Sequence, residues 1–310
     1  MQIALVIGYG SIGRRHLNVL KKINFFDELY VLSSQKITRY KKINKLSQIK
    51  SLNPDYIIIA KPTTEHYDYL NYCVKNLKNK KILVEKPLFS KNLQFNANSN
   101  KVYVGYNLRF HPVIKKLKSE IKNKKIFNVN IQNSSYLPSW RKNNVYTKTS
   151  SAKKSLGGGV LLDISHELDF IRYLFGNFII KHVVSKKISK LLIDTDDILV
   201  LYLIAKNSKS EQIDIQVNLN FFSHVLKRTI TCDSKNMSFV GDIMNNTFNY
   251  FRNKRKRTIK FKTEKNIILN QTYIDMHHAI LNNDNEITCD LKQGKKLMHD
   301  IERIRKKINK

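Results

Sequence analysis

A glycine-rich turn between an apolar strand and a helical stretch constrains the fold of this chain more than any other feature. Residues 3–7 read IALVI, a continuous apolar run typical of a strand that is buried on both faces. The next six residues read GYGSIG, and helical periodicity follows over residues 16–23. A GxGxxG sequence in this strand–turn–helix context is the fingerprint of dinucleotide binding.

Each part of this turn has a physical role in holding a cofactor. The first glycine permits the tight turn, the second lets the backbone approach a pyrophosphate, and the third allows the helix to pack closely on the strand. The N-terminus of the helix then offers N–H groups and the positive end of its dipole to the phosphates. We therefore expect cofactor contacts from Gly8, Gly10, Ser11, Ile12, Gly13 and Arg14.

The residue that selects between NAD and NADP should follow the second strand. An acidic residue about 20 positions past the turn would bind the ribose 2′-hydroxyl of NAD. Ser33 and Ser34 stand there instead, with Arg39 nearby. Because serines and a cation suit a 2′-phosphate better than a carboxylate would, we expect NADP or NAD, with NADP favoured.

Strands and helices alternate through the first third of the chain and change pattern after residue 107. Short apolar strands are expected at residues 29–32, 56–60, 82–84 and 102–105, with a helix near 67–77. This alternation predicts an α/β fold whose first domain, residues 1–107, is a Rossmann domain with a doubly wound parallel sheet.

The second domain, residues 108–310, is predicted to be α+β with a large, mostly antiparallel open sheet. A helix is expected over residues 157–174, and the basic stretch 252–262 is expected to form an exposed strand edge. The final helix, residues 291–308, can pack back on the first domain. The remaining strands are expected at residues 126–131, 179–184, 198–205, 213–222, 229–232 and 237–240.

The net charge of +32 is unusual, but composition bias explains it better than a nucleic-acid surface. Lys and Arg number 56 against 24 acidic residues, yet only 12 of the cations are arginine. Nucleic-acid sites rely on arginine forks as well as lysines, and no basic tail stands apart from the folded pattern. We therefore expect no specific nucleic-acid partner. A hydrophobic content of 42% excludes wholesale disorder.

Other patterns bear on location and metals. The longest apolar run, residues 198–205, is too short for a membrane span, and the first ten residues lack a basic leader and a cleavage site. Cys73, Cys232 and Cys289 lie far apart, which argues against a disulfide framework or a zinc site. We expect a cytoplasmic protein with no membrane association and no metal.

Five segments in the same order resemble the Gfo/Idh/MocA oxidoreductases, the family of glucose–fructose oxidoreductase and inositol dehydrogenase. They read GYGSIGRRH at residues 8–16, AKPTTEH at 60–66, EKP at 85–87, GYNLRF at 105–110 and GGGVLLDISH at 157–166. Two features depart from the family pattern. Residues 88–101 are short and Asn-rich where the family carries a helix, and Asp163 and His166 are three rather than four residues apart.

The resemblance implies an NAD(P)-dependent dehydrogenase or reductase that acts on a CH–OH group of a sugar or nucleotide sugar, in carbohydrate or surface-polysaccharide metabolism. It implies that His166 accepts the hydroxyl proton, that Asp163 orients His166 or hydrogen-bonds the neighbouring hydroxyl, and that Lys86 holds the substrate oxygen. A spacing of three residues, like the family's spacing of four, places Asp163 and His166 on one helix face. By resemblance, Pro62, Thr63, His66 and Glu85 contact the cofactor, and Pro87 can carry a cis bond.

The resemblance also implies a substrate pocket between the domains and assembly as a homodimer or homotetramer. Its pattern assigns substrate contacts to Arg109, Tyr136, Trp140 and Arg141. An indole flanked by guanidinium groups suits a sugar ring with anionic groups nearby. Two alternatives stay open: a non-catalytic NAD(P)-binding regulator on the same fold, and a basic nucleic-acid-binding protein.

Overall fold

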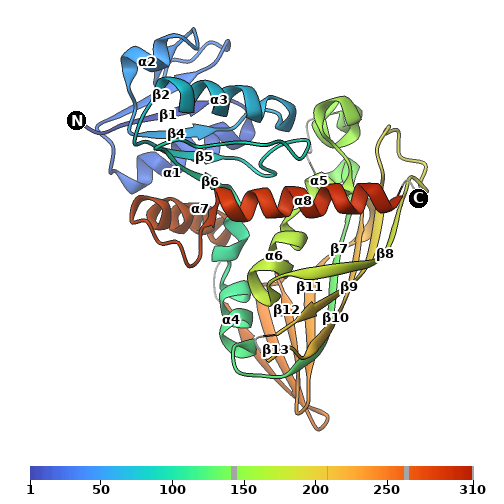
Figure 1. Ribbon diagram of the computed structural model, residues 1–310. Coiled ribbons are helices and arrows are strands. Elements are labelled where there is room, and N and C mark those ends of the chain that lie inside the picture. The colour runs from blue at the N-terminus through green and yellow to red at the C-terminus, as the bar shows by residue number, and fades with distance from the viewer. Residues whose placement is uncertain (141–144, 208, 262–264, 309–310) are drawn as a thin grey trace. The chain divides into compact units, whose positions relative to one another are not determined.

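The computed structural model describes residues 1–140, 145–207, 209–261 and 265–308 (Figure 1). The chain forms two compact units. The first contains Met1–Asn107 together with Asn270–His299, and the second contains Leu108–Leu269 together with Asp300–Lys310. Residues 270–299, which the sequence patterns left in the second domain, thus belong to the first unit.

A seven-stranded sheet forms the centre of the first unit, in the order β15-β6-β5-β4-β1-β2-β3. Strands β1 to β6 all run parallel to their neighbours, and only β15 pairs antiparallel, with β6. Every residue of β1 is buried, as expected for a strand covered on both faces. The predicted Rossmann sheet is confirmed. Its strands are β1 (Ile3–Ile7), β2 (Glu28–Leu32), β3 (Lys41–Ile43), β4 (Tyr56–Ile59), β5 (Lys81–Val84), β6 (Lys101–Val104) and β15 (Cys289–Asp290).

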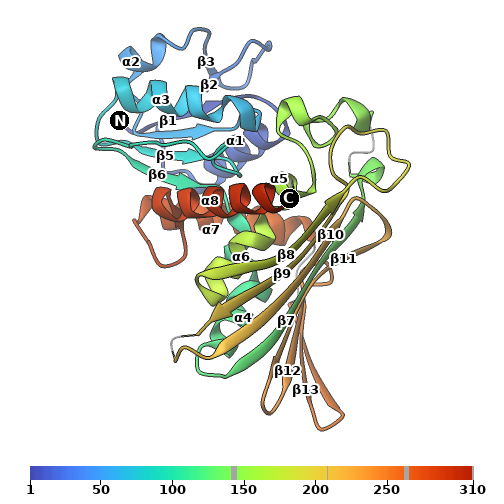
Figure 2. The same ribbon diagram turned by 45° about the vertical axis from the view of Figure 1, so that its right-hand side comes forward.

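Helices cover both faces of this sheet (Figures 1 and 2). Helix α1 (Ser11–Ile23) turns Leu17 and Leu20 towards the sheet and ends at Asn24, whose φ of 52° lies in the left-handed region. Helix α3 (His66–Asn76) lies on the opposite face. The unit also contains the short α2 (Gln48–Leu52), most of α7 (Lys265–Leu281) and the first part of α8 (Leu291–Ile308).

An eight-stranded sheet forms the second unit, in the order β14-β13-β12-β11-β7-β10-β9-β8. Neighbouring strands are antiparallel except β7 and β10, so the predicted mostly antiparallel sheet is confirmed. The basic strand β14 lies at an edge, where charged side chains discourage pairing with another chain. The strands are β7 (Ile126–Tyr136), β8 (Phe178–Lys186), β9 (Ile198–Lys206), β10 (Gln212–Asn220), β11 (Phe222–Ser234), β12 (Ser238–Asp242), β13 (Thr247–Arg252) and β14 (Arg255–Lys260).

Helices α4 (Pro112–Ile121) and α6 (His166–Phe175) pack on one face of this sheet, and the other face is open in Figure 2. Burial alternates along the strands accordingly, with Leu199, Leu201 and Leu203 of β9 turned inward. Short 3-10 helices join the elements of both units: Thr63–Glu65, Asn107–Phe110, Leu137–Ser139, Tyr146–Lys148, Ser150–Ala152 and Lys154–Leu156.

The prediction of one helix over residues 157–174 is wrong, because this segment contains two helices. Helix α5 (Val160–Asp163) ends before Ile164 and Ser165, and α6 begins at His166. Asp163 and His166 therefore belong to different helices, and the argument that spacing places them on one helix face does not apply. Apolar periodicity continues across the break, so it cannot distinguish one long helix from two short ones with the same buried side.

Candidate functional site

The glycine turn after β1 has no room for a side chain at Gly8 or Gly13. Gly8 has a φ of +106°, and a side chain there would meet the carbonyl oxygen of Ala60 at 2.4 Å. A side chain at Gly13 would meet the carbonyl oxygen of Gly8 at 2.1 Å, which explains the close approach of α1 to the turn. Gly10 differs, because nothing lies within 4 Å of the position a Cβ would take. This open glycine at the start of α1 leaves space for a ligand beside the N–H groups of the first helical turn.

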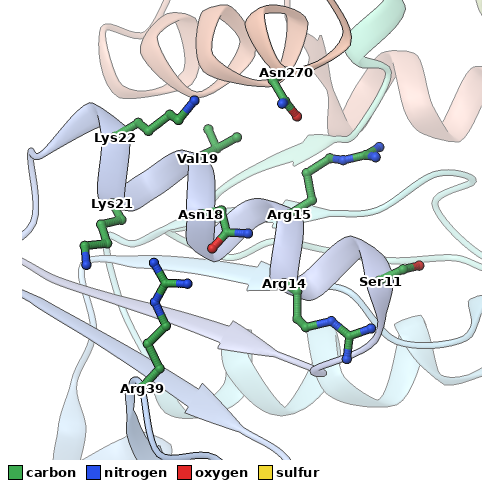
Figure 3. A pocket seen from close by; sticks show the side chains of 9 residues that line it. All are labelled: Ser11, Arg14, Arg15, Asn18, Val19, Lys21, Lys22, Arg39 and Asn270. Atoms are coloured by element: carbon green, nitrogen blue, oxygen red, sulfur yellow. The ribbon is translucent and has the colours of Figure 1, made fainter. Parts of the chain in front are cut away.

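A positively charged groove follows α1 from this turn (Figure 3). It has a volume of about 810 Å³, and none of the described residues that line it is acidic. Arg39 projects from the segment after β2 towards α1, and Arg14 lies near Ser11 at the start of the helix. The groove is lined by Ser11, Arg14, Arg15, Asn18, Val19, Lys21, Lys22, Arg39 and Asn270.

The two serines expected near the cofactor ribose, Ser33 and Ser34, follow the carboxyl end of β2. Ser33 is half-buried, and its hydroxyl accepts a hydrogen bond from the backbone N–H of Gln35 at 3.1 Å. Ser34 is exposed. Glu28 begins β2 and so lies at the opposite end of the strand, with Asp27 before it. No carboxylate follows β2 in the described segment between residues 33 and 40, as the sequence indicates.

The segment after β4 places His66 in the protein interior. Its Nδ1 lies 3.0 Å from the carbonyl oxygen of Pro87, and its Nε2 lies 2.8 Å from that of Lys61. Burial lowers the pKa of this histidine, although the nearby carbonyls oppose the shift. With 1% of its surface exposed, His66 ties the segment after β4 to the segment after β5. The nearby Pro62 is exposed and Thr63 is half-buried.

The EKP segment lies at the carboxyl end of β5, where doubly wound sheets bind ligands. The Lys86–Pro87 peptide is cis. Lys86 is half-buried, whereas Glu85 is buried and bonded to His16, with 2.9 Å between Oε1 and Nε2. Its other oxygen accepts the backbone N–H of Lys86 at 3.2 Å. Glu85 therefore holds the backbone at Lys86 from inside the first unit.

Two glycines shape the second unit's candidate site. A side chain at Gly158 would meet the carbonyl oxygen of Ser150 at 2.1 Å, and one at Gly159 would meet Oδ1 of Asp196 at 2.3 Å. The carboxylate of Asp196 accepts the N–H of Leu161 at 3.3 Å, which caps the start of α5. This packing places Asp163 at the end of α5 and His166 at the start of α6, both half-buried.

The residues predicted to bind substrate have different environments. The Nε–H of Arg109 donates to Asp169 at 2.9 Å, and each of these side chains is 2% exposed, so Arg109 presents little surface to a ligand. The ring of Tyr136 stacks on His224 with centroids 4.1 Å apart, an aromatic pair that no sequence signal indicates. Trp140 is 41% exposed and donates to the hydroxyl of Ser135 at 3.0 Å. Arg141 lies outside the described residues.

The described parts of the chain contain neither a candidate metal cluster nor a helix suited to a membrane. No group of three or more His, Cys, Asp or Glu side chains in these parts of the chain could hold a metal ion. None of the helices described is both long and apolar enough to cross a membrane.

Comparison with known proteins identifies the first domain. Residues 3–98 match the model of an oxidoreductase family with an NAD-binding Rossmann fold, GFO_IDH_MocA, which confirms the resemblance inferred from the motifs. An uncharacterised oxidoreductase of Bacillus subtilis (strain 168), YrbE, is 27% identical over 191 residues, which are 56% of this chain. The match spans about half of that relative, 53% of its length.

Solved structures share the fold over the whole chain. Levoglucosan dehydrogenase in complex with NADH and L-sorbose superposes with a TM-score of 0.80 at 15% identity, covering 100% of this chain and 97% of that one. The UDP-N-acetylglucosamine 3-dehydrogenase GnnA of Acidithiobacillus ferrooxidans has a TM-score of 0.76 at 14% identity, covering 99% and 97%. The WlbA dehydrogenase of Bordetella pertussis, in complex with NADH and UDP-GlcNAcA, has a TM-score of 0.76 at 15% identity, covering 99% and 96%. At these identities the likeness establishes the fold alone.

Proposed function

We propose that this chain transfers hydride between a nicotinamide cofactor and a hydroxyl or keto carbon of a sugar or nucleotide sugar, because residues 3–98 match the model of the GFO_IDH_MocA oxidoreductase family with its NAD-binding Rossmann fold. One observation carries the proposal. The glycine turn follows β1 and Lys86 follows β5, so both lie at the carboxyl ends of parallel strands of one sheet. A phosphate-binding turn and a substrate-binding amine thus share the edge at which such sheets bind ligands.

NAD(P) fits the residues of the turn. The open position at Gly10 admits the pyrophosphate, and the first N–H groups of α1 would bind it. Arg14 and Arg39, in a groove whose described lining contains no acid, favour NADP over NAD. When bound, the nicotinamide supplies the hydride chemistry, so the protein must bind, orient and move a proton.

The proton chemistry falls to three side chains. Lys86 would hold the substrate oxygen by a charge-assisted hydrogen bond. His166 would accept the hydroxyl proton at a ring nitrogen during oxidation and return it during reduction. Asp163 would orient His166 or bind the neighbouring hydroxyl. The exposed ring of Trp140 and the ring of Tyr136 would supply apolar faces for a sugar.

The substrate class rests on the similar proteins. The names of levoglucosan dehydrogenase, of GnnA and of the WlbA complex specify a sugar or a nucleotide sugar. Their identity to this chain is 15% or less, so the class is our proposal and the individual substrate is a matter for screening. We further propose a cytoplasmic homodimer or homotetramer that associates through the open sheet face. Light scattering on a sizing column tests the assembly.

Cofactor binding is the first test. Nicotinamide fluorescence with NADH and NADPH, side by side, should give micromolar dissociation constants for at least one cofactor. Folded protein that binds neither would overturn the proposal. A panel of sugars and nucleotide sugars is then screened by NAD(P)H absorbance. Lys86→Ala should abolish most turnover, and Lys91→Ala, which alters an exposed lysine, should not. Equal turnover in Lys86→Ala would favour a regulator that only binds the cofactor.

A further inference from the structure

Four buried polar side chains form a continuous chain of hydrogen bonds that ends at Glu85, next to Lys86. The hydroxyl of Tyr56 lies 2.8 Å from Nδ1 of His277, and Nε2 of His277 lies 2.9 Å from Nδ1 of His16. Nε2 of His16 lies 2.9 Å from Oε1 of Glu85. The four groups come from β4, α7, α1 and the end of β5, so distant parts of the sequence meet here.

The ionisation of three members sets the direction of the hydrogen bonds. Burial would raise the pKa of Glu85, but the hydrogen bond and the electrostatic interaction with His16, together with the charge of Lys86, hold this pKa below its usual value, so Glu85 is a carboxylate and only accepts. Burial lowers the pKa of His277 well below its usual value, so its ring is neutral. Burial raises the pKa of Tyr56 well above its usual value, so it keeps its proton.

The partners then fix a single direction for the hydrogen bonds, because the Glu85 carboxylate can only accept and the Tyr56 hydroxyl has its proton to donate. Tyr56 donates to Nδ1 of His277, His277 donates from Nε2 to Nδ1 of His16, and His16 donates from Nε2 to Glu85. Each imidazole then gives one hydrogen bond and accepts one. Because Tyr56 is fully buried, the chain ends inside the first unit and has no outlet through that residue to solvent. The arrangement suits orientation better than proton transport.

We propose that His277 is a positioning residue that fixes the Nε2–H tautomer of His16 and thereby holds the Glu85 carboxylate against the backbone N–H of Lys86. This inference rests on the substrate-binding role proposed for Lys86. The Glu85 side chain has little room to move once it is bonded to His16 and to the N–H of Lys86. A side chain at Gly105 would already lie 3.0 Å from Oε1 of Glu85. Loss of the donor at His277 would leave Nδ1 of His16 as a buried acceptor without its partner.

Two variants and one control test this role. His277→Leu removes the donor, and His277→Gln restores an N–H at the position of Nε2. His278→Leu makes the same change at the next residue of α7, whose side chain is exposed. With a substrate found by screening, His277→Leu should lower kcat about tenfold, as loss of an outer partner of a site residue commonly does. The dissociation constants of NADH and NADPH should stay unchanged, His277→Gln should recover most of the loss, and His278→Leu should match the natural chain.

Two further readouts need no substrate, so they separate this inference from the proposed function. Nitrogen-15 NMR of the imidazoles should show His16 protonated at Nε2 and bare at Nδ1 in the natural chain. Labelling of Lys86 by an amine reagent, followed by mass spectrometry, should change in His277→Leu and not in His278→Leu. A His16 ring protonated at Nδ1, or unchanged labelling in a folded His277→Leu protein, would overturn the inference even if a sugar substrate is found. If the His16 tautomer and the Lys86 labelling are as expected but no sugar or nucleotide sugar is turned over, the result contradicts the proposed function and leaves the role of His277 supported.

Discussion

The guanidinium of Arg109 and the carboxylate of Asp169 form a buried ion pair in the second unit, where Nε donates to Oδ2 at 2.9 Å. Arg109 belongs to the GYNLRF segment and Asp169 to helix α6, so the pair joins the start of this unit to the helix that covers its sheet. The guanidinium also lies 4.9 Å from the ring centre of Tyr173. Burial raises the pKa of Asp169 against the opposing charge of Arg109.

Removing one member of this pair should destabilise the second unit. Arg109→Leu should lower the free energy of unfolding by about 3–5 kcal/mol, because it leaves a buried carboxylate without its partner. The double variant with Asp169→Leu should recover much of the loss. Urea denaturation measures both, with Arg252→Leu on an exposed position of β13 as the control. A folded Arg109→Leu protein with full stability and a raised KM would instead support the substrate contact expected from the motif.

His111 should make stability depend on pH. It caps α4 by accepting the N–H of Val113 at 3.3 Å, and burial, with the nearby charge of Arg228, lowers its pKa from 6.5 to about 4. Between these values the unfolded chain binds the proton and the folded chain does not, so stability falls as pH falls. The difference between a pKa of 6.5 and one of about 4 corresponds to about 3 kcal/mol of unfolding free energy.

The control for this effect is His111→Asn, which keeps a capping acceptor and cannot titrate. Urea denaturation of both proteins from pH 7 to pH 4 gives the comparison. The difference in unfolding free energy between them should shift by that amount over the interval. A difference that is constant with pH would contradict the assignment. Other buried histidines act equally in both proteins and cancel.

Alanine substitutions at Gly159 and Gly176 should distinguish the cost of a steric clash from the cost of backbone strain. Both have positive φ, +105° and +78°, but a Cβ at Gly159 would lie 2.3 Å from Asp196 Oδ1, whereas one at Gly176 has nothing within 4 Å. Gly176→Ala should cost about 1–3 kcal/mol of unfolding free energy from its conformation alone, because φ and ψ there are 78° and −141°. Gly159→Ala should cost clearly more and should disturb α5, which the carboxylate caps. Equal losses in thermal denaturation would show that Asp196 moves freely.

Arg39 should discriminate between the cofactors. If its guanidinium binds the 2′-phosphate, Arg39→Ala should raise the dissociation constant of NADPH roughly tenfold or more, the worth of a charge-assisted hydrogen bond. The constant for NADH, which lacks that phosphate, should change little. Fluorescence titration of both cofactors measures the ratio. Lys22→Ala, which alters a lysine of the same groove, is the matched control. Equal weakening of NADH and NADPH would assign Arg39 to the shared part of the cofactor.

The main elements of both sheets could be predicted because each buried strand has a strong local pattern. IALVI and YIII mark β1 and β4 without reference to any other part of the chain. Helix α4 has a readable signal that the prediction missed, with Pro112 at its first position and buried Val113, Ile114 and Leu117 at helical spacing. The two-residue strand β15 has no such pattern, since it exists only through its pairing with β6.

The sequence alone determined the turn at Gly8 and the place of Lys86 after a strand, because glycine conformation and strand ends are local properties. Only the tertiary structure decided the partners of the polar side chains. His16 meets His277 from 261 positions along the chain, and Arg109 meets Asp169 from 60. Which carboxylate or imidazole pairs with which depends on how helices pack on the sheets. Motif spacing singles out Glu85 and Arg109, but only the packed structure shows that Glu85 is bonded to His16 and Arg109 to Asp169.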